Sequence, residues 1–195
     1  MTHALFLLSL LGFVIMFALP RLFFRSDGRM NARWWLTGAP FGIALHGVWL
    51  AWAGISPQLV DGGTTLATTL DALGMIATVG SIALIAATIA THRVPLALWH
   101  QDGDQNAPLH IVTYGPYGWV RHPFYASFLL LLLGAALIAR DGITVAALPL
   151  GLFSLDWTAR AEEKKLLASH LGDEYGAYRA RTGRFVPRLV PVGRS

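Results

Sequence analysis

The length of the uncharged apolar stretches restricts the fold of this chain more than any other feature. A membrane-spanning helix needs roughly 20 mostly apolar residues, and residues 3–24, 37–56 and 66–91 each meet that requirement. Charged residues make up only 13% of the 195-residue chain, whereas a soluble domain carries about 25%. The shortage of charge predicts that most of the chain lies in a lipid bilayer.

Two shorter apolar segments, 124–139 and 143–157, lie on either side of the turn Arg140-Asp141-Gly142. We interpret them as a tight helical hairpin that either crosses the bilayer with little margin or dips in and returns. Residues 4–19 lack a preceding basic region and a small-residue cleavage site, so we expect a retained span rather than a signal peptide. The predicted fold class is all-α, an integral membrane bundle of about five transmembrane helices.

Small residues recur along the third long segment. Gly74, Thr78, Ala83 and Ala87 are spaced so that they predict one face on which a neighbouring helix can approach closely in lipid. We expect ordinary packing of the bundle on this face, with no further role.

The distribution of positive charge predicts the orientation of the bundle. The segments expected on one side of the membrane hold Arg21, Arg25, Arg29, Arg33, Arg93, Arg121, Arg160, Lys164, Lys165, Arg179, Arg181, Arg184, Arg188 and Arg194. Of the 15 Lys and Arg residues, only Arg140 falls on the other side. Because cytoplasmic segments carry the excess of Lys and Arg, we expect the N-terminus outside and the C-terminus in the cytoplasm. In a bacterium the membrane would be the cytoplasmic, or inner, membrane.

Two polar segments are expected at the cytoplasmic face. The loop 92–123 is too long for a simple connector, and its apolar and aromatic residues indicate that it is ordered. In the tail, residues 159–171 predict an amphipathic helix ended by Gly172. An acidic pair then opens a second short helix over residues 173–181. We expect the loop and these C-terminal helices to form a cap over a site.

The first motif that predicts chemistry is residues 115–125, Gly-Pro-Tyr-Gly-Trp-Val-Arg-His-Pro-Phe-Tyr. Pro123 suits the first turn of a helix and disfavours the α conformation at His122, so His122 is expected at the N-cap. A helix N-terminus carries a partial positive charge, and Arg121 adds a full one, so an anion site is predicted here. The alternative is that Arg121 and Trp119 only anchor the helix at the membrane interface.

The second motif, residues 156–163, marks the exit of the last expected span. Asp156 and Arg160 stand four apart in the order that favours a helix salt bridge. In the functional alternative, Arg160 and Glu163 share a face directed at the cap, where they would meet a zwitterionic ligand. Glu162 would then lie beside the same ligand or remain a solvated helix residue.

The sequence gives little support for metal chemistry. The chain has no Cys, and its histidines lack the spacing of metal ligands, so no metal site is expected. His46 lies inside the second apolar segment, where an ionisable residue is either functional or hydrogen-bonded to a neighbouring helix. No nucleic-acid motif is present.

Both motifs resemble the signature of the isoprenylcysteine carboxyl methyltransferase and phospholipid methyltransferase superfamily. The first match is residues 113–125, Thr-Tyr-Gly-Pro-Tyr-Gly-Trp-Val-Arg-His-Pro-Phe-Tyr. The second is residues 160–166, Arg-Ala-Glu-Glu-Lys-Lys-Leu, followed by residues 171–178 and by Phe-Val-Pro at 185–187. The resemblance covers roughly residues 109–187 and includes the short helical hairpin between the motifs.

The resemblance implies an integral membrane methyltransferase that uses S-adenosylmethionine and acts on a lipophilic or small amphiphilic acceptor. It divides the chain into N-terminal transmembrane helices, residues 1–91, and a cofactor-binding catalytic half, residues 92–195. By position, the cofactor contacts of the family fall on Gly115, Tyr117, His122, Tyr125, Glu162 and Glu163. Arg121 is added to them from the anion site predicted at the helix N-terminus.

The acceptor side of the reaction is implied in less detail. Arg160 matches a family arginine near the acceptor, and it suits a carboxylate. Glu163 or a tyrosine would take the proton of an amine acceptor, so Arg160 and Glu163 are the catalytic candidates. The chain carries Ala126 and Ser127 where many relatives have a glycine, which would narrow helix packing at the site.

Several alternatives remain open from the sequence. A prenylated cysteine, an aminophospholipid, another isoprenoid lipid and a small thiol are all compatible acceptors, and the surrounding membrane lipids are the other expected partners. A non-enzymatic haem- or quinone-binding membrane anchor would need two facing histidines, and only His46 lies clearly within a span. A small transporter would need broken helices near mid-membrane, whereas the polar motifs here lie at one face.

Overall fold

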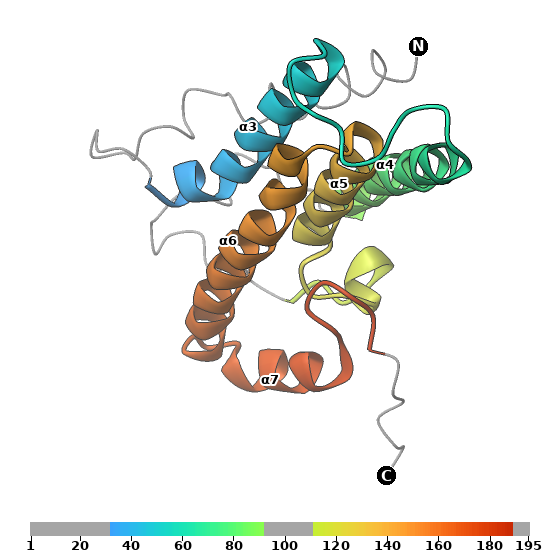
Figure 1. Ribbon diagram of the computed structural model, residues 1–195. Coiled ribbons are helices and arrows are strands. Elements are labelled where there is room, and N and C mark those ends of the chain that lie inside the picture. The colour runs from blue at the N-terminus through green and yellow to red at the C-terminus, as the bar shows by residue number, and fades with distance from the viewer. Residues whose placement is uncertain (1–31, 92–110, 189–195) are drawn as a thin grey trace.

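The computed structural model describes residues 32–91 and 111–188 (Figure 1). The expected first span, residues 3–24, and residues 92–110 of the expected loop lie outside the described residues. The described part contains the α-helices α3 (Ala32–Trp52), α4 (Thr65–Thr91), α5 (Pro123–Ala139), α6 (Gly142–Leu167) and α7 (Gly172–Arg181), and the 3-10 helix η3 (Gly115–Gly118). No strand occurs in this part, and the all-α fold class is confirmed.

Two of these helices, α4 and α6, are long and apolar enough to cross a membrane, and α5 is a shorter apolar helix. The outward side of α4 exposes large apolar residues, among them Ile76 and Val79. On α6, Phe153 is 73% exposed. An apolar surface of this kind suits contact with lipid, in agreement with the predicted membrane bundle.

Helix α6 corrects one expectation. Residues 143–157 and 159–171 were expected as two separate helices, yet α6 is a single helix of 26 residues that ends at Leu167. Its final turn carries Lys164 and Lys165, which complement the negative end of the helix dipole. Because the helix is continuous, its apolar part and its charged end form one rigid element that extends into the site.

The second expected span is confirmed as a helix, but its ends are shifted, and it is not one of the two described helices that are long and apolar enough to cross a membrane. It was expected over residues 37–56, and α3 instead ends at Trp52. Gly54 follows with a φ of 71°, a left-handed conformation that glycine adopts readily and that commonly ends helices.

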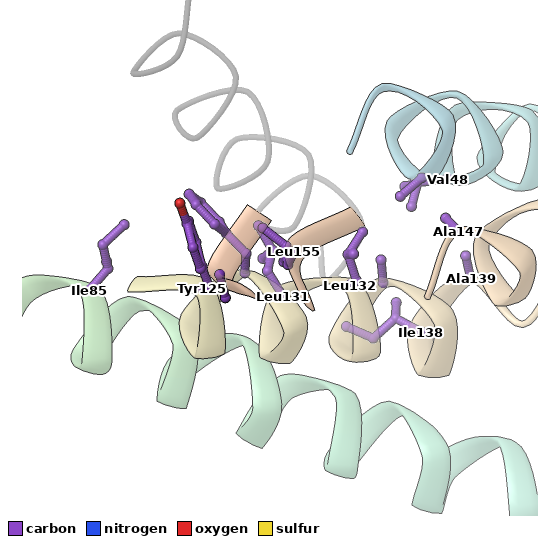
Figure 2. Close-up of a cluster of buried hydrophobic side chains, with 13 residues drawn as sticks. Val48, Ile85, Tyr125, Leu131, Leu132, Ile138, Ala139, Ala147 and Leu155 are labelled. Carbon is purple, nitrogen blue, oxygen red and sulfur yellow. The ribbon is translucent and has the colours of Figure 1, made fainter. Parts of the chain in front are cut away.

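Helix α5 is the central element of the described bundle. Its residues Leu131 and Leu132 are fully buried, and they form one apolar cluster with Val48 of α3, Ile85 of α4 and Leu155 of α6 (Figure 2). A helix that is apolar on all sides is typically enclosed by other helices, and α5 contacts α3, α4 and α6. The packing therefore fixes the position of the residues at the start of α5.

Close packing of α4 on α5 depends on small residues. A Cβ atom added to Gly134 would overlap the Thr78 hydroxyl and would lie 3.0 Å from the Gly74 carbonyl oxygen. Ser81 donates a hydrogen bond of 2.7 Å to the Ser127 carbonyl across the same contact. Gly74 and Thr78 thus lie on the predicted small-residue face.

The other half of that predicted face is wrong. Ala83 and Ala87 are exposed, and the buried positions of α4 continue instead through Ser81, Ile85 and Thr88. The physical reason is the helical repeat, since positions separated by three and four residues stay on one face, whereas Ala83 lies five residues beyond Thr78.

The turn between α5 and α6 lies beside the start of α4. Arg140 adopts a left-handed φ of 51°, and its side chain pairs with Asp71 of α4. The Arg140 carbonyl oxygen accepts a hydrogen bond of 2.7 Å from Leu59 N in the loop before α4. Asp141 caps α6, since its carboxylate accepts a bond of 2.8 Å from Ile143 N.

The other end of α5 lies beside the other end of α4, because η3, which precedes α5, contacts α4. A Cβ atom on Gly115 would approach Thr91 Oγ1 to 2.6 Å. Helix α5 thus runs antiparallel to α4 along most of its length. This arrangement favours the hairpin that crosses the bilayer over the one that dips in and returns.

Candidate functional site

The site is built on the first turn of α5. His122 is the N-cap residue, with φ −123° and ψ 64°, and Pro123 occupies the first turn, as the sequence predicted. The His122 ring stacks on the ring of Tyr125, with 5.4 Å between centroids and 4° between planes. Pro123 thus sets the backbone so that the imidazole lies against the aromatic side chain three residues later.

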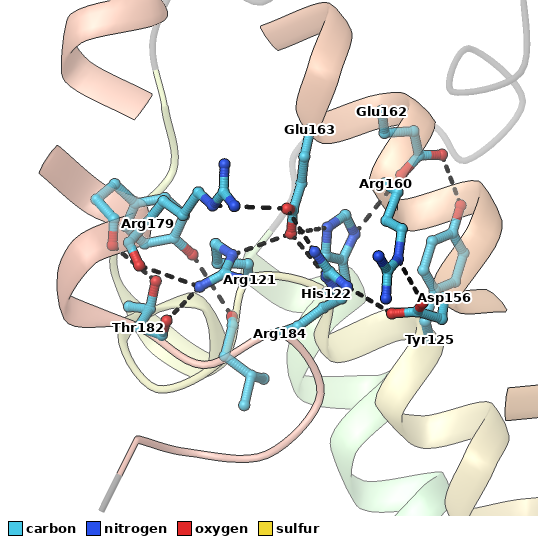
Figure 3. Close-up of polar contacts among 12 residues, drawn as sticks. Arg121, His122, Tyr125, Asp156, Arg160, Glu162, Glu163, Arg179, Thr182 and Arg184 are labelled. Carbon is cyan, nitrogen blue, oxygen red and sulfur yellow. Dashed lines mark hydrogen bonds and ion pairs between the residues drawn. The ribbon is translucent and has the colours of Figure 1, made fainter. Parts of the chain in front are cut away.

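The start of α5 and the end of α6 converge, as the two sequence motifs require. His122 Nε2 lies 3.3 Å from Glu163 Oε1, and His122 Nδ1 lies 3.5 Å from Glu162 Oε2. Tyr125 Oη donates a hydrogen bond of 2.6 Å to Glu162 Oε1. Figure 3 shows these side chains directed toward one another from the two helices.

Glu163 is the hub of a buried ion-pair network. Its side chain is only 3% exposed. Arg184 Nε lies 3.0 Å from Oε1 and Arg184 Nη2 lies 2.9 Å from Oε2, which is a two-pronged contact. Arg121 Nε donates to Oε1 at 3.1 Å, and Arg179 Nε lies 3.8 Å from Oε2. A buried carboxylate of this kind is tolerated because opposite charges surround it.

Arg184 was not identified as a site residue from the sequence, where it was counted only among the tail cations. It also pairs with Asp156, and the hydrogen bonds to Glu163, followed in weight by the bond to Asp156, raise the pKa of Arg184 above its usual value. The signal that marks it is its place directly before the Phe185-Val186-Pro187 match. Spacing alone gave no reason to bring it to α6.

The backbone around Arg184 forms a strap, residues 182–185, across the start of α5. Gly183 pairs with Val120 in an isolated parallel bridge. Arg121 N donates to the Gly183 carbonyl at 2.8 Å, and His122 N donates to the Arg184 carbonyl at 3.0 Å. The strap thus supplies acceptors to two backbone N–H groups that precede α5.

Arg160 takes the position of the salt-bridge alternative. Its side chain is 67% exposed, and its Nε lies 2.6 Å from Asp156 Oδ2. Glu163, three residues later, is instead buried in the ion-pair network. The two catalytic candidates therefore lie in different environments at the end of α6, and the expectation that they share one face is wrong.

Three of the cofactor candidates hold the segment before α5 against neighbouring elements. Gly115 has a φ of 60° and allows close approach to the end of α4. Tyr117 is buried, burial raises the pKa of its phenol, and its carbonyl accepts a bond of 2.7 Å from Tyr178 Oη. Besides its bond to Glu163, Arg121 donates to the Thr182 carbonyl and, at 3.2 Å, to that of Arg179.

The remaining three candidates, His122, Tyr125 and Glu162, contact one another where α5 begins and α6 ends. The Glu162 side chain is 30% exposed, which suits a carboxylate that accepts bonds from an ammonium or a ribose hydroxyl. His122 Nε2 is buried, and it lies 3.3 Å from Glu163 Oε1. The two stacked rings are largely buried, with His122 9% and Tyr125 7% exposed. Within the described residues, no cluster of His, Cys, Asp and Glu is built to hold a metal ion.

Comparison with known proteins points to the same region. Residues 98–168 match the isoprenylcysteine carboxyl methyltransferase family, and the resemblance to this superfamily is confirmed. The chain is 31% identical over 115 residues to the cobalt-zinc-cadmium resistance protein CzcN of Cupriavidus metallidurans, covering 59% of this chain and 50% of that protein. It is 31% identical over 81 residues to the protein-S-isoprenylcysteine O-methyltransferase of Schizosaccharomyces pombe, covering 42% of this chain and 34% of that protein. The chain therefore spans about half or less of these relatives.

Proposed function

We propose that this membrane protein, whose residues 98–168 match the isoprenylcysteine carboxyl methyltransferase family, transfers a methyl group from S-adenosylmethionine to a lipophilic or small amphiphilic acceptor. The observation that carries the proposal is the meeting of the two motifs, with His122 within 3.5 Å of both Glu162 and Glu163. Neither the described residues nor the comparisons favour the alternative of a haem- or quinone-binding anchor.

In the proposed site, the residues at the start of α5 and the end of α6 bind and orient the cofactor. The cofactor supplies a methyl group on a positively charged sulfur. Glu162, held by Tyr125, accepts bonds from an ammonium or from ribose hydroxyls. The parallel rings of His122 and Tyr125 provide faces that attract a cation. Alignment of the reacting atoms in a dry site is worth about 7–11 kcal/mol of the barrier.

Glu163 and Arg160 receive different roles in this proposal. Glu163 is occupied by two arginines, so it acts by holding the site together rather than by accepting a proton from the acceptor. Arg160 lies exposed at the end of the apolar part of α6, close along the helix to the exposed Trp157. From there it would bind a carboxylate on an acceptor that arrives from the bilayer.

The class of acceptor is the least defined part of the proposal. One relative is named for an isoprenylcysteine substrate and the other for metal resistance, so the names alone do not select among a carboxylate, an amine and a thiol. We propose a lipophilic or amphiphilic acceptor because the site lies at the end of apolar helices. The site is proposed to face the cytoplasm.

Calorimetry with S-adenosylhomocysteine and purified protein in detergent tests the cofactor assignment. We expect binding in the micromolar range, and a loss of about tenfold or more in His122→Ala, since that change removes both a stacked ring and a polar group. His170→Ala, an exposed histidine in the turn before α7, is the matched control and should bind normally. Absence of binding by folded wild-type protein would refute the assignment.

Transfer itself is tested with radiolabelled S-adenosylmethionine. Membranes that contain the protein are incubated with total membrane lipids and, separately, with a panel of thiols and prenylated cysteines. We expect label in one class of product, and its chemical identification gives the acceptor. Label in none of them, with protein that binds S-adenosylhomocysteine, would refute the proposed acceptor class.

A further inference from the structure

We infer that the strap, residues 182–185, fixes His122 in the site, and that Arg184 is the positioning residue that fastens the strap to α6. The inference rests on the proposed function, because the site that the strap completes is the proposed cofactor site. How firmly Arg184 holds the strap on α6 can be measured without any cofactor.

The strap holds His122 from two directions. His122 N donates a hydrogen bond of 3.0 Å to the Arg184 carbonyl. The ring of Phe185 meets the His122 ring edge-on, with 6.2 Å between centroids and 62° between planes. Tyr125, whose ring stacks on that of His122, belongs to α5 itself. The contacts from the strap come instead from the C-terminal part of the chain.

Arg184 links the strap to α6 through two carboxylates. Its Nε and Nη2 atoms contact the two oxygens of Glu163 at 3.0 and 2.9 Å, and its Nη1 reaches Asp156. A planar guanidinium makes such a forked contact, and an ammonium does not. Figure 3 shows Arg184 between Glu163 and Asp156, beside His122. Because the side chain is only 22% exposed, solvent weakens these contacts less than it weakens surface pairs.

The conformation of the strap restricts which residue can occupy position 183. A Cβ atom on Gly183 would overlap the Val186 carbonyl group, so the chain reverses there in a manner that requires glycine. Thr182 Oγ1 donates to the Tyr178 carbonyl at 2.8 Å and ties the beginning of the strap to α7. The strap is thus held at both ends, by α7 and by Arg184.

Cofactor affinity provides the first test. We expect Arg184→Gln to weaken S-adenosylhomocysteine binding about tenfold or more, and Arg184→Lys to restore part of the loss, because it keeps the charge without the fork. Arg188→Gln removes an exposed arginine four residues further along the tail. Its affinity for S-adenosylhomocysteine should stay within about twofold of the wild-type value. In turnover, we expect Arg184→Gln to raise the KM for S-adenosylmethionine more than it lowers kcat. Equal affinity of Arg184→Gln and wild type would overturn the inference.

Limited trypsin digestion provides the second test, and it needs no ligand. Trypsin can cleave after Arg184 only when the strap detaches from the start of α5 and from α6. Mass spectrometry should therefore show that this cleavage is slow in the wild type. We expect Glu163→Gln to accelerate it about tenfold or more, while Glu174→Gln, an exposed acid of α7, leaves the rate unchanged. Asp156→Asn removes only the second carboxylate and should give an intermediate rate, which also serves if Glu163→Gln fails to fold.

The two tests separate failure of the inference from failure of the proposed function. Wild-type protein that binds no cofactor but shows faster cleavage in Glu163→Gln would refute the proposed function and support the fastened strap. Wild-type protein that binds cofactor, with cleavage after Arg184 unchanged in both Glu163→Gln and Asp156→Asn, would overturn the inference and leave the proposed function standing.

Discussion

The hydroxyl of Tyr125 donates a hydrogen bond of 2.6 Å to Glu162 Oε1 and thereby joins the first turn of α5 to the charged end of α6. The Tyr125 ring is buried, while Glu162 remains partly exposed. The bond therefore orients a carboxylate that is still accessible to a ligand. It is the contact on which the proposed recognition of the cofactor most directly depends.

Tyr125→Phe should keep the ring stacked on His122 and remove this hydrogen bond. A hydrogen bond to a partly exposed charged group is worth about 1 kcal/mol, so we expect roughly a fivefold loss of S-adenosylhomocysteine affinity, measured by calorimetry. Tyr125→Leu, which also removes the stacked ring, should lose more. Unchanged affinity in both variants would show that neither group contacts the cofactor.

Gly134→Ala should weaken the contact between α4 and α5. The added methyl group would overlap the Thr78 hydroxyl, and overpacking of this kind costs about 1–3 kcal/mol. Gly80→Ala on α4 is the matched control, since nothing lies within 4 Å of its added Cβ and alanine favours helix. Thermal unfolding in detergent should show a lower midpoint for Gly134→Ala alone. Equal midpoints would contradict the close packing described.

Single cysteines can test the orientation, because the chain contains no natural Cys. Gly62→Cys places a cysteine in the loop between α3 and α4, and His170→Cys places one in the turn before α7. By the charge distribution, a membrane-impermeant maleimide should label Gly62→Cys in intact cells and His170→Cys only after permeabilisation. The reverse pattern would place the proposed site outside the cytoplasm.

Alkaline pH should destabilise the cap through its buried tyrosines. Burial raises the pKa of Tyr178 from its usual 10.0 to about 12, and its hydroxyl donates to the Tyr117 carbonyl. Because the pKa of Tyr178 is higher in the folded state than in the unfolded state, its neutral hydroxyl stabilises the fold fully below pH 10. This stabilisation is lost as the pH rises toward 12.

We therefore expect Tyr178→Phe to lose less stability than wild type between pH 10 and pH 12, although it starts from a lower value. Denaturation midpoints measured across that window provide the comparison. Tyr114→Phe, at an exposed position, should follow the wild-type curve. Parallel curves for Tyr178→Phe and wild type would show that this tyrosine does not contribute to the alkaline transition.

Much of the fold was predictable because helix formation in a membrane depends on local sequence. The expected segment 66–91 appears as α4, and segment 124–139 appears as α5 with Pro123 added at its start. The conformation of His122 followed from the proline after it, and the Asp156–Arg160 pair followed from helical spacing. The single helix α6 was missed because a change from apolar to charged residues resembles a helix boundary, although it does not break backbone hydrogen bonds.

The sequence by itself determined the apolar helices α4 and α5, the hairpin between the two motifs and the conformation of His122 at the start of α5. Only the tertiary structure decided which charges meet. Arg184, 21 positions after Glu163, occupies that carboxylate, whereas Arg160, three positions before it, turns away to Asp156. The physical reason is that ion pairs between separate elements depend on the distances set by packing, and neither hydropathy nor helical spacing contains those distances.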